Sequence, residues 1–307
     1  MIPRAGSRAA VAGVTLCCVA FLMSVAPARA ADPPFIGWSW LLPGIAWEYD
    51  PSSADDCIAG RFTCINKTLS TMRTQFDAAA RVCDHDAVFA LTYLRTTEEF
   101  RRAVETDGFF EDPYYLNHED AVFAQLYFQA KANWDSGNTS AVPGAWATAF
   151  DAADQRAVSG QGNLLLGINA HVQLDLPFTL AAIGLVKPDG TTRKTDHDRV
   201  NRFLSRVQFT AEAARRFDPT FDDGSLPGTT IDDTVIFQVF PAWREEAWRN
   251  AERLAAARTT AERALVEASI EAAAVATANT FKAAYAYSPL SDGSVARDAY
   301  CAANWDS

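Results

Sequence analysis

Apolar side chains recur at steps of three and four residues along most of this chain, and that spacing marks one face of an α-helix. Two clear series run from Leu69 to Cys83 and from Phe123 to Trp134. The same pattern predicts helices at residues 86–105, 145–158, 163–184, 198–217, 242–257 and 260–285. Turns rich in Pro, Gly and Asp separate them. The pattern therefore predicts an all-α fold, a single multi-helix domain of about eight helices.

Two segments depart from this pattern. The first, "TTIDDTVIFQVF" (Thr229–Phe240), is rich in β-branched and aromatic residues, which favour a strand. No other segment offers such a strand a partner, so we predict a helix that begins after Asp232 or Asp233. The second, residues 31–65, contains "PPFIGWSWLLPGIAWEYDP", with four prolines and three tryptophans. This composition predicts an irregular aromatic and proline-rich N-terminal wrap across the helices.

The first thirty residues have the layout of a secretory signal peptide. Arg4 and Arg8 precede an apolar run, which ends at the small residues of Ala28-Arg29-Ala30. The run stops at a cleavage signal, so we expect removal after Ala30 and no retained membrane span. The sequence thus predicts an exported protein, secreted or held in the cell envelope.

Charge and length narrow the possible roles of the mature chain. Three of the 27 basic residues and no acidic ones lie in the leader, which leaves 24 basic and 38 acidic groups and a net charge near −14. Such a surface repels nucleic acid and anionic lipid headgroups. About 277 residues remain without a linker or repeat, so we predict one domain, residues 31–307.

Four cysteines lie outside the leader, and an even number in an exported chain predicts two disulfides. Three connectivities are possible. Cys57 and Cys64 bracket a short loop that contains glycine and could close locally, which would leave Cys83 for Cys301.

Polar side chains interrupt one of the most apolar predicted helices. The stretch "GINAHVQLDLPFTL" (Gly167–Leu180) includes Asn169, His171 and Asp175. On a helix, His171 and Asp175 share one face with Phe178 and look inward, whereas Asn169 points elsewhere, toward a neighbouring helix. A buried polar group without a partner costs about 1–3 kcal/mol, so these groups need partners or a metal.

The four histidines all have acidic neighbours in the sequence, and two interpretations fit them. In the functional one, imidazoles and carboxylates from several helices bind zinc or another divalent metal, because neutral His and ionised Asp suit such ions. The candidate metal ligands are His85, Asp120, His171, Asp175, His197 and Asp198. In the structural one, each His–Asp pair is a buried hydrogen-bonded strut that fixes helix register.

A second group of charges lies in "PAWREEAWRNAERL" (Pro241–Leu254). Arg244 and Glu245 fall within one helical turn, so a buried arginine–carboxylate clamp toward the histidines is possible. The alternative is an exposed helix face with ion pairs such as Glu245 with Arg249. No serine elbow, phosphate-binding loop or dinucleotide fingerprint is present in the sequence.

Five blocks of the chain resemble the bacterial domain of unknown function family 5995, which is common in actinobacteria. They are "CDHDAVFALTYLRTTEEF" (83–100), "HEDAVFAQLYFQA" (118–130), "LLLGINAHVQLDLPFTL" (164–180), "KTDHDRVNRFL" (194–204) and "WREEAWRNAERL" (243–254). The resemblance spans most of the mature chain and implies a largely helical domain. It implies no activity.

A looser similarity connects the chain to zinc-dependent phospholipase C and the related fungal single-strand nucleases. Those all-α, exported enzymes hold metal partly through a His-x-x-x-Asp helix followed by proline, and His171, Asp175 and Pro177 are similar to that arrangement. They also use more histidines than the four here and an N-terminal Trp, whereas the first Trp here is Trp38. The similarity therefore implies one or two metals at most.

These observations lead to three hypotheses. The first is an exported metal-dependent hydrolase that acts on phosphoesters or other esters of a small-molecule or lipid-like substrate. Its candidate catalytic residues are His171, Asp175, Asp120, Arg244 and Glu245, with Asn169 as a supporting residue. The second is a non-catalytic cell-envelope or interaction protein with a buried His–Asp network. The third is a pocket between helices for a small apolar ligand.

Overall fold

The computed structural model describes residues 48–204, 210–220, 233–288 and 293–307, all within one compact unit, Phe35–Ser307. The predicted signal peptide and most of the predicted N-terminal wrap lie outside the described residues. Residues 48–61 form turns, and the first described helix begins at Phe62.

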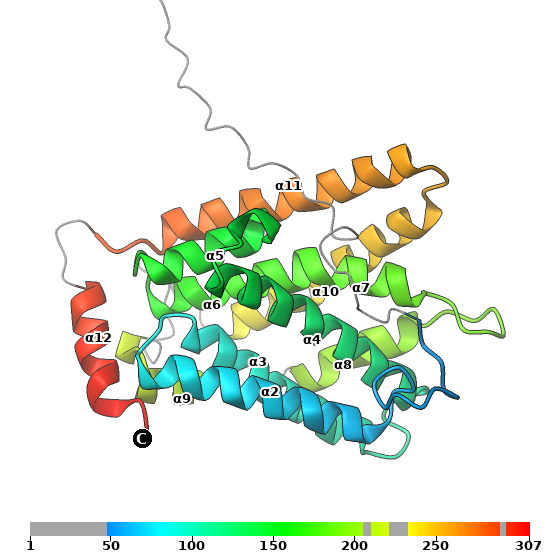
Figure 1. The fold of residues 1–307 in the computed structure, drawn as a ribbon, viewed down its shortest axis with the longest axis horizontal. Coiled ribbons are helices and arrows are strands. Elements are labelled where there is room, and N and C mark those ends of the chain that lie inside the picture. The colour runs from blue at the N-terminus through cyan, green and yellow to red at the C-terminus, as the bar shows by residue number, and fades with distance from the viewer. Residues whose placement is uncertain (1–47, 205–209, 221–232, 289–292) are drawn as a thin grey trace, which may run out of the picture. The chain divides into compact units, whose positions relative to one another are not determined.

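The described residues fold as helices, which confirms the all-α prediction (Figure 1). In these segments there is no β-strand, only two isolated bridges, Val158 with Ala286 and Val186 with Thr192. The α-helices are α2 (Phe62–Arg81), α3 (Ala87–Val104), α4 (Pro113–Asp135), α5 (Gly144–Asp154), α6 (Gly160–Ile168), α7 (Leu176–Ile183), α8 (Lys194–Leu204), α9 (Thr210–Arg216), α10 (Asp233–Ala256), α11 (Thr260–Ala284) and α12 (Gly293–Asn304). A short 3-10 turn (Thr139–Ala141) and a π-helical segment, η2 (Asn169–Asp175), complete the list.

Most helix boundaries follow the apolar periodicity. Helix α10 begins at Asp233, so the β-branched segment before Phe240 continues as a helix, as predicted. The helix expected at 198–217 instead begins at Lys194 and is described as two helices, α8 and α9. Helix α12 had no counterpart among the predicted elements.

Local signals explain where two long helices begin. Helix α4 begins with Pro113 after Asp112, whose carboxylate accepts a hydrogen bond from the Tyr115 amide. Pro suits the first helical position because its missing N–H would have no helical partner. Helix α11 begins with a capping box between Thr259 and Glu262, which satisfies amides at both positions.

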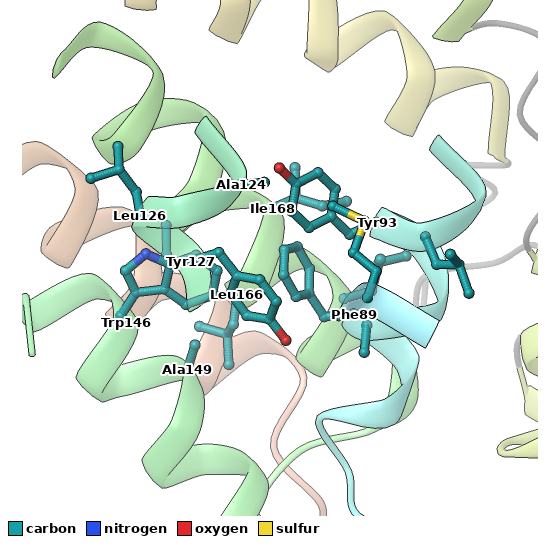
Figure 2. Packing of buried hydrophobic residues seen from close by; sticks show 14 of the residues in the cluster. Phe89, Tyr93, Ala124, Leu126, Tyr127, Trp146, Ala149, Leu166 and Ile168 are labelled. Carbon is teal, nitrogen blue, oxygen red and sulfur yellow. The ribbon is translucent and has the colours of Figure 1, made fainter. Parts of the chain in front are cut away.

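The centre of the fold is one continuous helical run, α6–η2–α7. It contacts α3, α4, α5, α10 and α11, and Figure 1 shows α11 on one side of it and α2 on the other. Gly167 allows a close approach in this run, because a Cβ there would lie 2.4 Å from Cδ2 of Phe89. Figure 2 shows Phe89, Tyr93, Tyr127 and Trp146 packed together beside the run. The polar residues of η2 therefore lie in the middle of the hydrophobic core.

Two disulfides are present, as predicted, with the connectivity that the short loop favoured. Cys57 is bonded to Cys64, and Cys83 is bonded to Cys301 on α12. The second bridge joins residues 218 positions apart and ties the last helix to the loop before α3. None of the described helices is both long and apolar enough for a membrane span.

Candidate functional site

A cavity of about 130 Å³ lies between α3, α4, the central helical run, α8 and α10. Its wall is mostly apolar and includes the rings of Phe89, Phe100, Phe123, Phe203 and Phe240. A small number of polar side chains reach the same wall: Tyr93, Thr97, Glu119, Asp120, His171 and Arg244. An apolar cavity with a few convergent polar groups is the usual form of a small-molecule site.

His171 is the central polar group of this cavity. Its Nδ1 lies 2.8 Å from Oδ2 of Asp175, one helical turn away on η2. The Trp146 indole N–H donates to both oxygens of Asp175, at 3.0 and 3.2 Å. Because Asp175 offers acceptors, the natural arrangement has Nδ1–H donating to it, which leaves a lone pair on Nε2. Among the described residues, Nε2 has no hydrogen-bond partner.

Aromatic rings fix the plane of the imidazole. Phe123 of α4 stacks on it with ring centroids 3.5 Å apart and an interplanar angle of 8°. Tyr93 of α3 meets it edge-on at 4.4 Å. With the Asp175 hydrogen bond, these contacts hold Nε2 in one direction.

Burial disfavours the charged form of His171 and of Asp175. Loss of water lowers the pKa of His171 well below its usual value. Burial also raises the pKa of Asp175, although the hydrogen bond from Trp146 acts in the opposite direction. His171 is therefore uncharged at neutral pH and can accept a proton, the state that a general base requires.

Two neighbouring carboxyl groups of α4 face the same cavity in an unusual protonation state. Burial, followed by the charge of Glu119, raises the pKa of Asp120 to about 8. Burial raises the pKa of Glu119 to about 7 against the opposing effect of Arg244. At pH 7 most Asp120 side chains are thus protonated and can donate a hydrogen bond. Oδ2 of Asp120 has no hydrogen-bond partner within the described segments.

Four residues with hydroxyl groups line the cavity, and the hydroxyls of two of them, Thr92 and Thr96, donate to backbone carbonyls. The Tyr93 and Thr97 hydroxyl oxygens are buried, and neither has a hydrogen-bond partner in the part of the chain that is described. Burial, with the nearby Asp120 and Asp175, raises the pKa of Tyr93 well above its usual value, so this phenol keeps its proton. The cavity thus offers several proton donors that the protein itself does not use.

Arg244 reaches the cavity from α10 and is held by His197 of α8. The Nη2 group of Arg244 donates to the His197 carbonyl at 2.8 Å and lies 3.2 Å from His197 Nδ1. His197 Nε2 lies 3.0 Å from the Arg244 carbonyl. Nδ1 must accept and Nε2–H must donate, so His197 is neutral, in agreement with its lowered pKa, for which burial is the main cause.

The other candidate residues lie elsewhere. His85 is bound to Asp298 at 3.0 Å and to Arg297 at 3.0 Å, which ties it to α12. Asp198 and Glu245 both pair with Lys194 near the surface, and Glu245 also pairs with Arg249. Asn169 donates to the Ala274 carbonyl of α11. The cavity therefore brings together Asp120, His171 and Arg244, with Asp175 behind His171.

The predicted metal ligands do not gather in this arrangement. No group of three or more His, Cys, Asp or Glu side chains lies close enough to share a metal within residues 48–204, 210–220, 233–288 and 293–307. Both ring nitrogens of His85 and of His197 are engaged by protein groups. Asp175 is likewise engaged by His171 and Trp146. Of the predicted ligands, His171 and Asp120 line the cavity and each has one atom, Nε2 and Oδ2, without a hydrogen-bond partner among the described residues. These two atoms could bind a metal.

The comparison with protein families assigns most of the chain. Residues 65–284 match the model of a family of unknown function, DUF5995. The chain belongs to the DUF5995 family. No curated protein and no solved structure matches it. The match includes the central helical run and every wall of the cavity, so the site lies within the DUF5995 domain.

Sequence reasoning missed several residues of this site. Trp146 reaches Asp175 from a helix with no polar pattern, and Glu119 lies beside the predicted Asp120. Tyr93 lies one turn after Phe89 among the buried residues of α3, so in the sequence it resembles a core aromatic. Its hydroxyl was the only available signal, since a buried tyrosine normally needs a partner.

Proposed function

We propose that this protein is a hydrolase of small, largely apolar esters. The observation that carries the proposal is the buried Nε2 of His171, oriented by Asp175 and Phe123 and without a partner among the described residues. A His held by a carboxylate through Nδ1, with Nε2 directed to a pocket, is the arrangement of a general base.

The proposed reaction uses water as the nucleophile. His171 Nε2 takes a proton from water as the oxygen attacks the ester carbonyl. The carbonyl oxygen gains negative charge, which hydrogen bonds from protonated Asp120 and from Tyr93 stabilise. The C–O bond then breaks, and the proton on His171 passes to the alcohol that leaves. The products are one carboxylic acid and one alcohol, and His171 returns to its neutral state.

The sequence also suggested zinc or another divalent metal at this site, and that remains a proposal. Few ligands are available for such an ion. His171 Nε2 and Asp120 would hold it, and the described residues offer no third ligand beside them. No step above depends on a metal. The proposed extracytoplasmic location, secreted or in the cell envelope, has the support of two disulfides, which persist in oxidising compartments.

The test is hydrolysis of nitrophenyl esters with short acyl chains, measured by release of nitrophenol. We expect His171→Ala to lower kcat/KM by about 100-fold or more, because general-base catalysis contributes roughly that much. Asp198→Asn is the matched control, since Asp198 lies near the surface and should leave the rate unchanged. Treatment with a chelator should not alter the rate. Loss of activity that zinc restores would instead assign a metal to this site.

The non-catalytic alternative predicts a different result. If the His171–Asp175 pair only fixes helix register, the protein hydrolyses none of these esters and His171→Ala lowers the melting temperature. A variant that keeps its melting temperature and loses an activity of the wild type would exclude that alternative.

A further inference from the structure

Arg244 is buried in the cavity wall with one donor, its Nε–H group, that the described residues do not use. Arg244 is 7% exposed. Its Nε atom is buried and has no hydrogen-bond partner among the described residues. The hydrogen bonds to His197 engage Nη2 alone. His197 thus fixes Nη2, and the Nε–H group stays available to a ligand.

The charge of this guanidinium is poorly balanced inside the cavity. Burial lowers the pKa of Arg244 to about 10, so it is still charged at pH 7. Among the acids of the cavity wall, Glu119 is the one whose charge acts on Arg244, and its own pKa of about 7 leaves it half ionised. Asp198, the other acid that acts on Arg244, lies outside the cavity and pairs with Lys194, which also pairs with Glu245. The site therefore matches a ligand with one negative charge.

The size of the cavity limits the apolar part of that ligand. An engineered cavity of about 150 Å³ in another protein holds one benzene molecule. The space here is about 130 Å³, so it suits an apolar group of similar or slightly smaller size. Rings of Phe100, Phe123, Phe203 and Phe240 would surround it.

We propose that the cavity binds a small monocarboxylate, with its carboxylate on Arg244 and an apolar group of about six carbon atoms among the phenylalanine rings. Binding of this kind goes beyond hydrolysis and does not require it. Both Nη2 hydrogens of Arg244 are engaged by His197, so the carboxylate would accept one charge-assisted hydrogen bond, from the Nε–H group. Where hydrolysis does occur, an acid of this class is its product.

The experiment is isothermal titration calorimetry of the protein with benzoate and hexanoate, each compared with its neutral amide. We expect each acid to bind at least about tenfold more tightly than its amide, because a hydrogen bond to a charged group contributes roughly 1.5–3 kcal/mol. Acetate lacks the apolar group and dodecanoate exceeds the cavity, so both should bind more weakly than hexanoate. Inorganic phosphate should bind more weakly than benzoate.

Two variants connect this preference to Arg244. Arg244→Gln should reduce the affinity for benzoate at least about tenfold and leave benzamide unchanged. Arg249→Gln, an exposed position of the same helix, should change neither affinity. Equal affinity for acid and amide in the wild type overturns the proposal, and so does tighter binding of dodecanoate or phosphate. These outcomes do not require a folded Arg244 variant, and they do not depend on ester hydrolysis.

Discussion

Replacement of Asp120 by Asn should remove part of the pH dependence of stability. Burial is the main reason that the pKa of Asp120 rises from 3.8 to about 8 in the folded protein. Between these values the folded protein holds a proton that the unfolded chain has released, so a rise in pH favours unfolding. The stabilising contribution is complete below pH 3.8 and is lost as the pH rises through about 8.

The size of this effect follows from the two pKa values. One group with these values removes roughly 3–4 kcal/mol of folding free energy between about pH 5 and about pH 8. Glu119 and Glu271, each with a pKa of about 7, act in the same direction. His171 acts in the opposite direction, because its lowered pKa reduces stability in acid. A comparison of wild type with Asp120→Asn leaves mainly the titration of Asp120 and its coupling to Glu119.

The assay is urea unfolding of both proteins at several pH values from 5 to 8.5 in one buffer system. The wild type should lose roughly 3–4 kcal/mol relative to Asp120→Asn across that range. Asp198→Asn, at an exposed residue, should run parallel to the wild type. A difference between wild type and Asp120→Asn that stays constant with pH within about 1 kcal/mol would refute a buried, protonated Asp120.

Four further outcomes test other parts of the structure. The rate of ester hydrolysis should be constant near neutral pH and fall as the pH rises through about 8, because Asp120 then loses the proton that it donates; a pH–rate profile measures this. Cys301→Ser should lower the free energy of unfolding by about 3–5 kcal/mol in urea, since its disulfide closes a separation of 218 residues. Gly167→Ala should cost about 1–3 kcal/mol in the same assay, although Ala favours helices, because its Cβ would meet Phe89 at 2.4 Å. Asn169→Ala should cost about 1 kcal/mol and lower the melting temperature, since it removes the buried hydrogen bond from Asn169 to the Ala274 carbonyl of α11.

The sequence predicted the parts of the fold and site that depend on near neighbours in the chain. Apolar spacing located the helices, because each helix buries one face. The same spacing placed His171 and Asp175 one turn apart on an inward face, and the structure joins them at 2.8 Å. Phe123 was part of a predicted apolar series and Asp120 was a candidate ligand, and both line the cavity.

Contacts between distant segments could not be predicted in this way. His85 carries acidic neighbours in sequence, yet its partners are Arg297 and Asp298, more than 200 residues away. His197 contacts Arg244, which is 47 residues away in the sequence. The role of His197 becomes clear only when its buried arginine partner is known. Periodicity states which face of a helix is buried, but it does not state which other helix covers that face.

The sequence contains one local signal for the π-helical segment, a proline, that was not used to predict it. Pro177 follows Asp175 closely, and in an α-helix its ring would clash with the carbonyl four residues earlier. The chain widens just before it: the Leu176 amide donates to the His171 carbonyl, five residues back. Such insertions are frequent at functional sites, where they change the direction of a side chain without ending the helix. The proline therefore marks the place where this helix leaves α-geometry, and His171 lies on the widened turn.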